Sequence, residues 1–382
     1  MRKLLHIRNL LFALLIIYSL QGVLYTQGSI ISQGSLFLYY ALSGIYFVKV
    51  IFTKHKKSLF LNAWTALLII NILGYVFTGN YSRDLGMFKG VLMSLLSFYP
   101  FYYMSRNGEL KSKHLIFFLF IMIPVTISTF YFNRIQFLSQ LSYEREDIVN
   151  NIAYSFVSLI PLVFLIKKNR LLSVAIMLVL IFFIIQGGKR GAIVVGAMGL
   201  MMYIYYQMRT VNKKYKVRGY ILISIVAVVI GYFAYDMFIS NEYLISRMEQ
   251  MVEGNVSGRD RIYANIFNGW LESDSFMNLL FGYGFAGSRL LSGSGHFAHN
   301  DWLELLSNFG LLGVSIFLIL FYSIFKTIRN SNWGNDKKII FLTIMGMWFA
   351  TSIFSMGYTS MGGYLNAMML AYLLGSRSKN LV

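Results

Sequence analysis

Long apolar stretches alternate with short polar segments along nearly the whole chain. Each stretch approaches the ~20 residues that an α-helix needs to cross a bilayer. Twelve can be delimited, at about 9–26, 31–52, 59–78, 85–105, 114–132, 148–166, 171–187, 192–208, 220–240, 302–325, 339–357 and 360–375. The pattern predicts an all-α polytopic membrane protein with about twelve transmembrane helices, in which residues 1–382 form a single membrane domain.

The composition fits a protein built for lipid. Hydrophobic residues make up 57% of the chain and charged residues 13%, whereas a soluble domain has roughly 25% charged residues. The chain has no cysteine, which excludes disulfides, thiol nucleophiles and cysteine-ligated metals. Because no small-x-small cleavage site follows the first apolar stretch, we expect an uncleaved first span rather than a signal peptide.

Basic residues are unevenly distributed between alternate polar segments. If the amino terminus is cytoplasmic, about two thirds of the 34 Lys and Arg residues fall on the cytoplasmic side, as the positive-inside rule requires. We therefore predict that both termini are cytoplasmic and that the number of spans is even. Basic loops beside anionic membrane lipids account for the net charge of +19, so no nucleic-acid partner is expected.

The polar segment 241–299 is the longest between two apolar stretches, and we predict that it forms a large extracytoplasmic loop. Apolar residues recur at helical spacing between Arg261 and Trp270, which predicts a short amphipathic helix at the membrane interface. The glycine-rich run at 282–287 follows no strand, so it is not interpreted as a nucleotide-binding loop.

A glycine-framed basic pair, Lys189 and Arg190, lies between two apolar stretches. Placing both cations at the bilayer centre costs roughly 5–7 kcal/mol, so they belong at the span ends, facing a polar cavity. A tight turn whose cations contact lipid phosphates is the structural alternative. A basic turn on the outer side opposes the positive-inside rule, which favours a functional role.

Two further groups of polar residues lie in or beside the large loop. Arg259 and Arg261 flank Asp260. For Asp260, capping of the following helix is as well supported as a functional role. His299 and Asn300 lie where the loop meets the next apolar helix, and a titratable imidazole at this boundary suits chemistry on a lipid-borne substrate.

Asp301 and Glu304 follow directly and have the spacing of a capping box. We therefore expect these two acids to start the helix rather than to take part in acid–base chemistry. Capping by Asp301 and Glu304 leaves His299 and Asn300 unexplained.

The order of these motifs resembles that of the O-antigen ligase and O-antigen polymerase superfamily. The resemblance rests on a basic turn between two spans, Ser257-Gly258-Arg259 in the large loop, and His299-Asn300 before a Leu-rich helix that contains Gly310-Leu311-Leu312-Gly313. It covers chiefly residues 186–313. His296 lies three positions before His299, whereas many members have a second histidine two positions before, so no role is transferred to it.

The resemblance implies a membrane-embedded glycosyltransferase of the C type. It would use a polyprenyl-diphosphate-linked oligosaccharide donor and a glycan acceptor, in the bacterial cytoplasmic membrane with the active site facing outward. The family's functional arginines fall on Arg190 and Arg259, and its histidine falls on His299.

The chemistry expected of these residues agrees with that resemblance. Arg190 and Arg259, aided by Lys189 or Arg261, would hold the diphosphate leaving group, because arginine binds phosphate through a bidentate fork. His299 would remove the proton from the attacking acceptor hydroxyl, with inversion at the anomeric carbon.

Asn300 would orient the imidazole or bind a sugar hydroxyl, with helix capping as an equal alternative. The chain has no Asp-x-Asp pair and no clustered acidic and histidine residues at ligand spacing, so we expect no metal and no cofactor.

Three functions remain open at this point. A polymerase of lipid-linked repeat units, producing O-antigen, capsule or exopolysaccharide, is favoured. A ligase that transfers the finished glycan to a lipid core or another acceptor is the alternative. A flippase or transporter for the same lipid is weaker, because the chain has few ionisable residues deep within its spans. For the polymerase, a flippase and a chain-length regulator are the expected protein partners.

Overall fold

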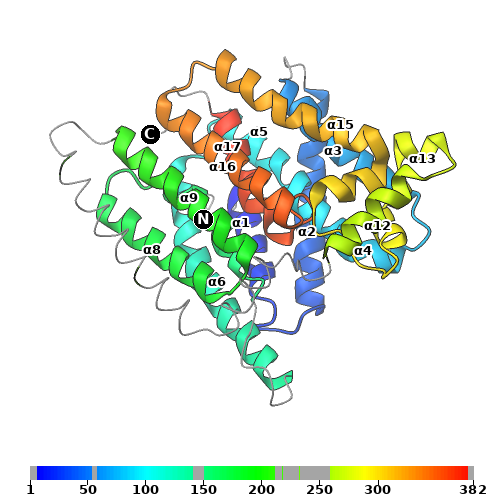
Figure 1. The fold of residues 1–382 in the computed structure, drawn as a ribbon. Helices are drawn as coiled ribbons and strands as arrows, with labels where there is room; N and C mark the ends of the chain where they lie inside the picture. Colours follow the sequence, from blue (N-terminus) through cyan, green and yellow to red (C-terminus); the bar gives the residue numbers. More distant parts are fainter. Residues whose placement is uncertain are drawn as a thin grey trace.

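The computed structural model describes residues 7–53, 58–140, 150–210 and 259–376, together with positions 217 and 232; side chains are described to residue 136 in the second range. Within these ranges the protein is helical and contains no β-strand (Figure 1). The first half comprises α1 (Ile7–Ser19), α2 (Ile30–Phe52), α3 (Leu59–Val76), α4 (Tyr81–Val91), the π-helical segment η1 (Leu92–Leu96), α5 (Phe98–Arg106) and α6 (Ser112–Gln140). The second half comprises α7 (Ala153–Val163), α8 (Arg170–Gln186), α9 (Arg190–Thr210), α12 (Arg259–Leu271), α13 (Phe276–Phe281), α14 (Gly287–Leu291), α15 (Asp301–Asn330), α16 (Asn335–Phe354), the 3-10 helix η3 (Met361–Gly363) and α17 (Tyr364–Gly375).

Six of the described helices, namely α2, α3, α6, α9, α15 and α16, are long and apolar enough to cross a membrane. The helices α1, α7 and α8 are apolar but shorter. The prediction of a helical membrane protein is therefore supported, whereas the count of twelve spans is not confirmed.

Several of the predicted spans differ from the structure or lie outside it. The stretch 85–105 is divided by the π-helical segment η1, and 148–166 contains the eleven-residue helix α7. Apart from position 232, the predicted span 220–240 lies outside the described residues.

Polar contacts between distant segments define two ends of the helical bundle. At one end Lys167 binds Asp336 (Nζ to Oδ2, 2.6 Å) and Lys337 donates to the carbonyl of Ser376 (2.9 Å). At the other end the hydroxyls of Ser19 and Tyr364 lie 3.4 Å apart.

Aromatic side chains pack the centre of the bundle beneath the second end. The Trp64 ring lies 5.1 Å from that of Phe98 and 5.2 Å from that of Trp348, measured between centroids. Its indole N–H donates to the carbonyl of Leu95 in the π-helical segment (2.9 Å), so this buried polar group is paired. This packing joins α3, α5 and α16 and gives the second end a rigid base.

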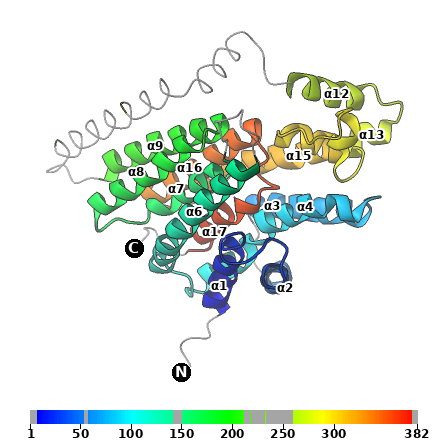
Figure 2. The same cartoon turned by 90° about the horizontal axis from the view of Figure 1, so that it is seen from below.

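The amino-terminal part of α15 is bent to receive the loop that precedes it. Gly310 has φ +58° and ψ −150°, and a Cβ there would lie 2.5 Å from the carbonyl oxygen of Leu279, so only glycine fits. The amide of Tyr283 donates to the carbonyl of Ser307 (2.8 Å), and that of Gly284 to the carbonyl of Asn308 (3.1 Å). The bend seats α13 against α15, beside α12 (Figure 2).

The helix predicted within the large loop is present as α12, two residues longer at its amino terminus than expected. Two further short helices, α13 and α14, follow it in the same segment. Part of the predicted loop, from 241 to 258, lies outside the described residues. The glycine-rich run at 282–287 supports the bend of α15.

Candidate active site

A cavity of about 540 Å³ opens among the helix ends at the second end of the bundle, within the ~300–1,000 Å³ range of small-molecule sites. Lys189, Arg190, Arg259 and His299 all line it. Three sequence motifs that are separated by up to 110 positions thus meet at one place. The structure therefore brings together four of the six predicted site residues.

The turn that carries Lys189 and Arg190 depends on its glycines. Gly188 has φ +61°, a left-handed conformation that glycine adopts without strain. A Cβ on Gly187 would lie 2.6 Å from the Cβ of Ala153, and the Gly187 carbonyl accepts from the amide of Asn150 (2.9 Å). The close approach of this turn to α7 fixes where both cations enter the cavity.

Arg190 is also the first residue of α9, so the amino terminus of that helix lies at the cavity. Gly191 follows, and any Cβ on it would collide with the Tyr154 hydroxyl and lie 3.2 Å from the Cβ of Phe354. A helix amino terminus presents unpaired N–H groups and a partial positive charge of about half an elementary charge. The start of α9 therefore adds to the attraction of the side chains for an anion.

Arg259 reaches the same cavity from the first residue of α12. Its guanidinium donates to the carbonyl of Phe354, the last residue of α16 (3.2 Å). One turn further along, burial raises the pKa of Tyr263, while its contacts with Arg259 and Asn300 act in the opposite direction. Arg259 thus links α12 to the end of α16 and keeps a cation at the rim.

His299 has a backbone conformation that few non-glycine residues adopt, with φ +53°. The residues on either side hold it there. The Ala298 amide donates to Glu304 Oε1 (2.6 Å), and Asn300 Oδ1 accepts from the amides of Trp302 (2.9 Å) and Leu303 (3.2 Å). Backbone strain of this kind costs about 1–3 kcal/mol and clusters at functional sites.

The predicted capping box is wrong, and the two acids have different tasks. Asn300, not Asp301, caps α15, and its amide also donates to the carbonyl of Ile353 (3.1 Å). Asp301 is fully buried and accepts from the amides of Gly357 (2.9 and 3.0 Å) and Tyr358 (3.3 Å). Asp301 therefore holds the loop between α16 and α17, part of which lines the cavity.

Glu304 is also fully buried and holds the segment that precedes His299. Besides the Ala298 amide, it accepts from the Ser288 hydroxyl (2.7 Å). Sequence reasoning missed these positioning roles. The available signal was the presence of two acids at the start of an apolar membrane helix, where unpaired charges are costly.

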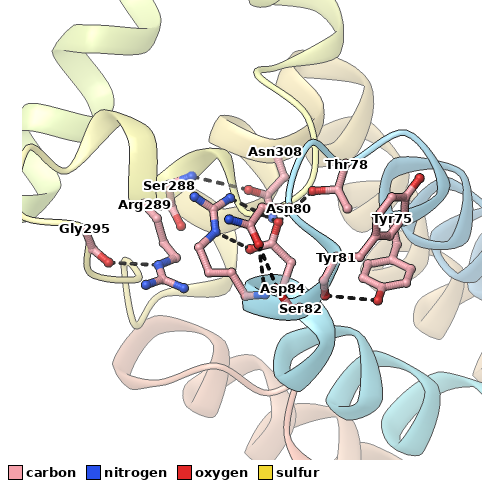
Figure 3. A network of polar contacts seen from close by, with 11 residues as sticks. Tyr75, Thr78, Asn80, Tyr81, Ser82, Asp84, Ser288, Arg289, Gly295 and Asn308 are labelled. Atoms are coloured by element: carbon pink, nitrogen blue, oxygen red, sulfur yellow. Dashed lines mark hydrogen bonds and ion pairs between the residues drawn. The ribbon is translucent and has the colours of Figure 1, made fainter.

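A second polar network surrounds Asp84, close to Ser288 and Arg289 of this segment (Figure 3). Asp84, which is fully buried, accepts from Arg83 (2.7 and 3.1 Å) and from the Thr78 hydroxyl (2.6 Å) in the turn between α3 and α4. Across from this turn, Arg289 donates to the carbonyl of Gly295 (2.9 Å). The bond from Arg289 closes the loop from 289 to 295 that leads to His299.

The site has a positive electrostatic potential that acts on its titratable groups. Desolvation lowers the pKa of the His299 imidazole, and the positive charges of Arg259 and Lys189 lower it further, as does His296. Desolvation, followed by the charge of Arg259, also lowers the pKa of Lys189. At neutral pH the imidazole is therefore mainly neutral and able to accept a proton.

Two other predicted residues are not brought to the cavity. Arg261 lies on the exposed side of α12 and does not line the cavity, and Asn300 supports the site as a helix cap. His296 is exposed and also lies outside the lining. In the part of the chain that the structure describes, no group of three or more His, Cys, Asp and Glu side chains could hold a metal ion.

The remainder of the cavity has a neutral lining that the sequence did not reveal. Trp64, Met347, Trp348 and Ala367 form an apolar portion, and uncharged polar groups come from α7, η1 and α17. These residues are far apart in the sequence and belong to apolar stretches without any recognisable motif.

Models of known protein families and curated protein sequences show no match to this chain.

Proposed function

We propose that this protein is a membrane glycosyltransferase that uses a polyprenyl-diphosphate-linked glycan as donor. One observation carries the proposal: Lys189, Arg190 and Arg259 meet His299, an imidazole of lowered pKa, in a single cavity at one end of a bundle of apolar helices. The order of the same residues in the sequence resembles the O-antigen ligase and polymerase superfamily. The cavity thus offers cations for a diphosphate and a base for a hydroxyl.

The cations would stabilise the leaving group. As the glycosidic C–O bond to the diphosphate breaks, the electron pair and the negative charge pass to the polyprenyl diphosphate. Arg190 and Arg259 would each bind phosphate oxygens, and each charge-assisted hydrogen bond contributes about 1.5–3 kcal/mol. Lys189 and the amino terminus of α9 would add to the positive electrostatic potential around the diphosphate. We expect the transfer to need no metal ion.

His299 would act as the general base. The acceptor hydroxyl oxygen attacks the anomeric carbon from the side opposite the diphosphate, and the hydroxyl proton passes to the imidazole nitrogen. The new C–O bond then has the inverted configuration. A mainly neutral imidazole suits this step, because a protonated one has no lone pair for the proton.

We assign the protein to the bacterial cytoplasmic membrane, with the cavity on the outer side. Nucleotide sugars are cytoplasmic, so a transferase that acts outside needs a donor linked to a lipid. We favour polymerisation of lipid-linked repeat units into a surface polysaccharide, with a flippase and a chain-length regulator as partners. Ligation of the finished glycan would use the same residues with another acceptor. Deletion of the gene distinguishes the two, because surface glycan shortened to one repeat indicates a polymerase and unattached long glycan a ligase.

The catalytic assignment is tested with purified His299→Ala and His299→Gln variants. Loss of a general base lowers turnover about 10²–10⁴-fold, so both variants should lose transfer to this extent while still binding donor. His296→Ala is the matched control, since this exposed histidine does not line the cavity and should leave the rate nearly unchanged. Near-normal transfer by the glutamine variant, which forms hydrogen bonds but is no base, would overturn the assignment.

A further inference from the structure

Part of the cavity lining, here called the neutral wall, is polar but carries no charge. Ser94 in η1, Ser158 in α7 and Asn366 in α17 line it, whereas the cations lie at helix ends. The Ser94 hydroxyl donates to the carbonyl of Ser360 (2.7 Å), and the Ser158 hydroxyl to that of Tyr154 (3.0 Å). Each serine has therefore committed its proton to the backbone and presents only oxygen lone pairs to a ligand.

Asn366 has an unpaired carbonyl oxygen. Its Oδ1 is buried, and no described residue donates a hydrogen bond to it. Buried polar groups in proteins are nearly always paired, and an unpaired acceptor is destabilising. A ligand that donates a hydrogen bond to this oxygen removes that penalty, and the three acceptors together suit a ligand with several donors.

We propose that this neutral wall, formed by Ser94, Ser158 and Asn366, binds the sugar ring next to the donor diphosphate. A sugar ring is uncharged and carries several hydroxyl donors, which fits the acceptors, while a polyprenyl chain has none. The adjoining cations take the diphosphate, so one cavity receives both parts of the donor headgroup. The proposal rests on the proposed function and adds Asn366 to it as a specificity-determining residue.

The test compares two lipids on the same purified protein in detergent. One is undecaprenyl diphosphate, and the other is the lipid-linked glycan extracted from cells of the native host that lack this protein. The wild type should bind the lipid-linked glycan at least about tenfold more tightly, because of the added hydrogen bonds. Asn366→Ala should remove most of this advantage and leave undecaprenyl diphosphate binding unchanged, which also shows that the variant is folded.

Asn71→Ala is the matched control. Asn71 is a fully buried asparagine with an unpaired Oδ1 as well, but it does not line the cavity, so its variant should keep the full advantage of the glycan. Should Asn366→Ala fail to fold, Ser158→Ala should reduce the advantage about threefold.

Equal binding of both lipids by the wild type, or an unchanged advantage in Asn366→Ala, would overturn the sugar site while leaving diphosphate binding intact. Failure of the wild type to bind either lipid would overturn the proposed function itself.

Discussion

Replacing Glu304 by alanine tests whether a buried acid holds the turn at His299 in place. Glu304 accepts two buried hydrogen bonds, from the Ala298 amide (2.6 Å) and the Ser288 hydroxyl (2.7 Å), and the first lies next to the strained residue His299. The variant leaves both donors unpaired, at about 1–3 kcal/mol each. The observed turn therefore loses about 2–6 kcal/mol relative to relaxed alternatives.

A loss of about 2 kcal/mol corresponds to a roughly 30-fold fall in the population of the competent turn, if that turn is only marginally favoured. We therefore expect the turnover of Glu304→Ala to fall by about 30-fold or more. Donor binding should change less, because Lys189, Arg190 and Arg259 are held by other elements. Glu304→Gln should stay within about tenfold of the wild type, since its amide can still accept from Ala298 and donate to Ser288.

The pH profile separates displacement of His299 from a general loss of structure. In the wild type the lowered pKa keeps the imidazole neutral, so activity is present at neutral pH and is lost as the pH falls through that pKa. If Glu304→Ala frees the turn, the imidazole becomes better solvated and moves from the cations, and its pKa should rise toward the ordinary ~6.5. The variant should then lose proportionally more activity at pH 6 than at pH 8.

The assay is transfer of glycan from extracted lipid-linked donor by purified protein, measured as turnover at saturating donor across this pH range. Binding of undecaprenyl diphosphate serves as the control for folding. If the turnover of Glu304→Ala stays within threefold of the wild type, and activity falls at the same acidic pH, the hydrogen bonds of Glu304 do not position His299.

Three further predictions concern the cations, the base and the topology. Arg190→Lys and Arg259→Lys should each reduce transfer severely, because lysine keeps the charge but loses the bidentate fork. The activity of the wild type should survive EDTA. Inactivation by EDTA that a divalent ion reverses would contradict the metal-independent mechanism. Arg259→Gln, which removes the positive charge, should raise the pKa of His299, so the loss of activity on acidification should begin at a higher pH. An unchanged pH profile would show that the two groups do not interact. In this cysteine-free chain, Ser273→Cys should react with an impermeant thiol reagent in intact cells and Ser58→Cys should not; the opposite labelling would place the cavity on the cytoplasmic side.

The sequence by itself determined the general class of the protein and the residue types of its candidate site. Apolar runs of spanning length leave few alternatives to a helical membrane protein, because unpaired backbone groups are not tolerated in lipid. The polar motifs containing Arg190, Arg259 and His299 stood out for the same reason. In such a composition, each charged or titratable residue away from the basic loops has a cost that must be offset by a function or a partner.

The predicted number of membrane-crossing elements is not confirmed by the described residues. Hydropathy does not register the π-helical segment η1 or the shortness of α7, since both depend on how neighbouring helices pack. Capping was also misassigned. The spacing of Asp301 and Glu304 fits a capping box, but which residue caps is decided by the chain direction before the helix, and that is set by the left-handed turn at His299.

Only the tertiary structure decided which residues share the cavity. Arg261 and Arg259 are two positions apart, yet on a helix they point in different directions, and only Arg259 lines the cavity. Asp301 and Glu304 bind partners 6 to 57 positions away, and Asn366 lines a cavity formed by several helices. Periodicity along one segment reports its local conformation and its apolar face, whereas hydrogen bonds between distant segments form only when the helices pack, and these bonds position the site.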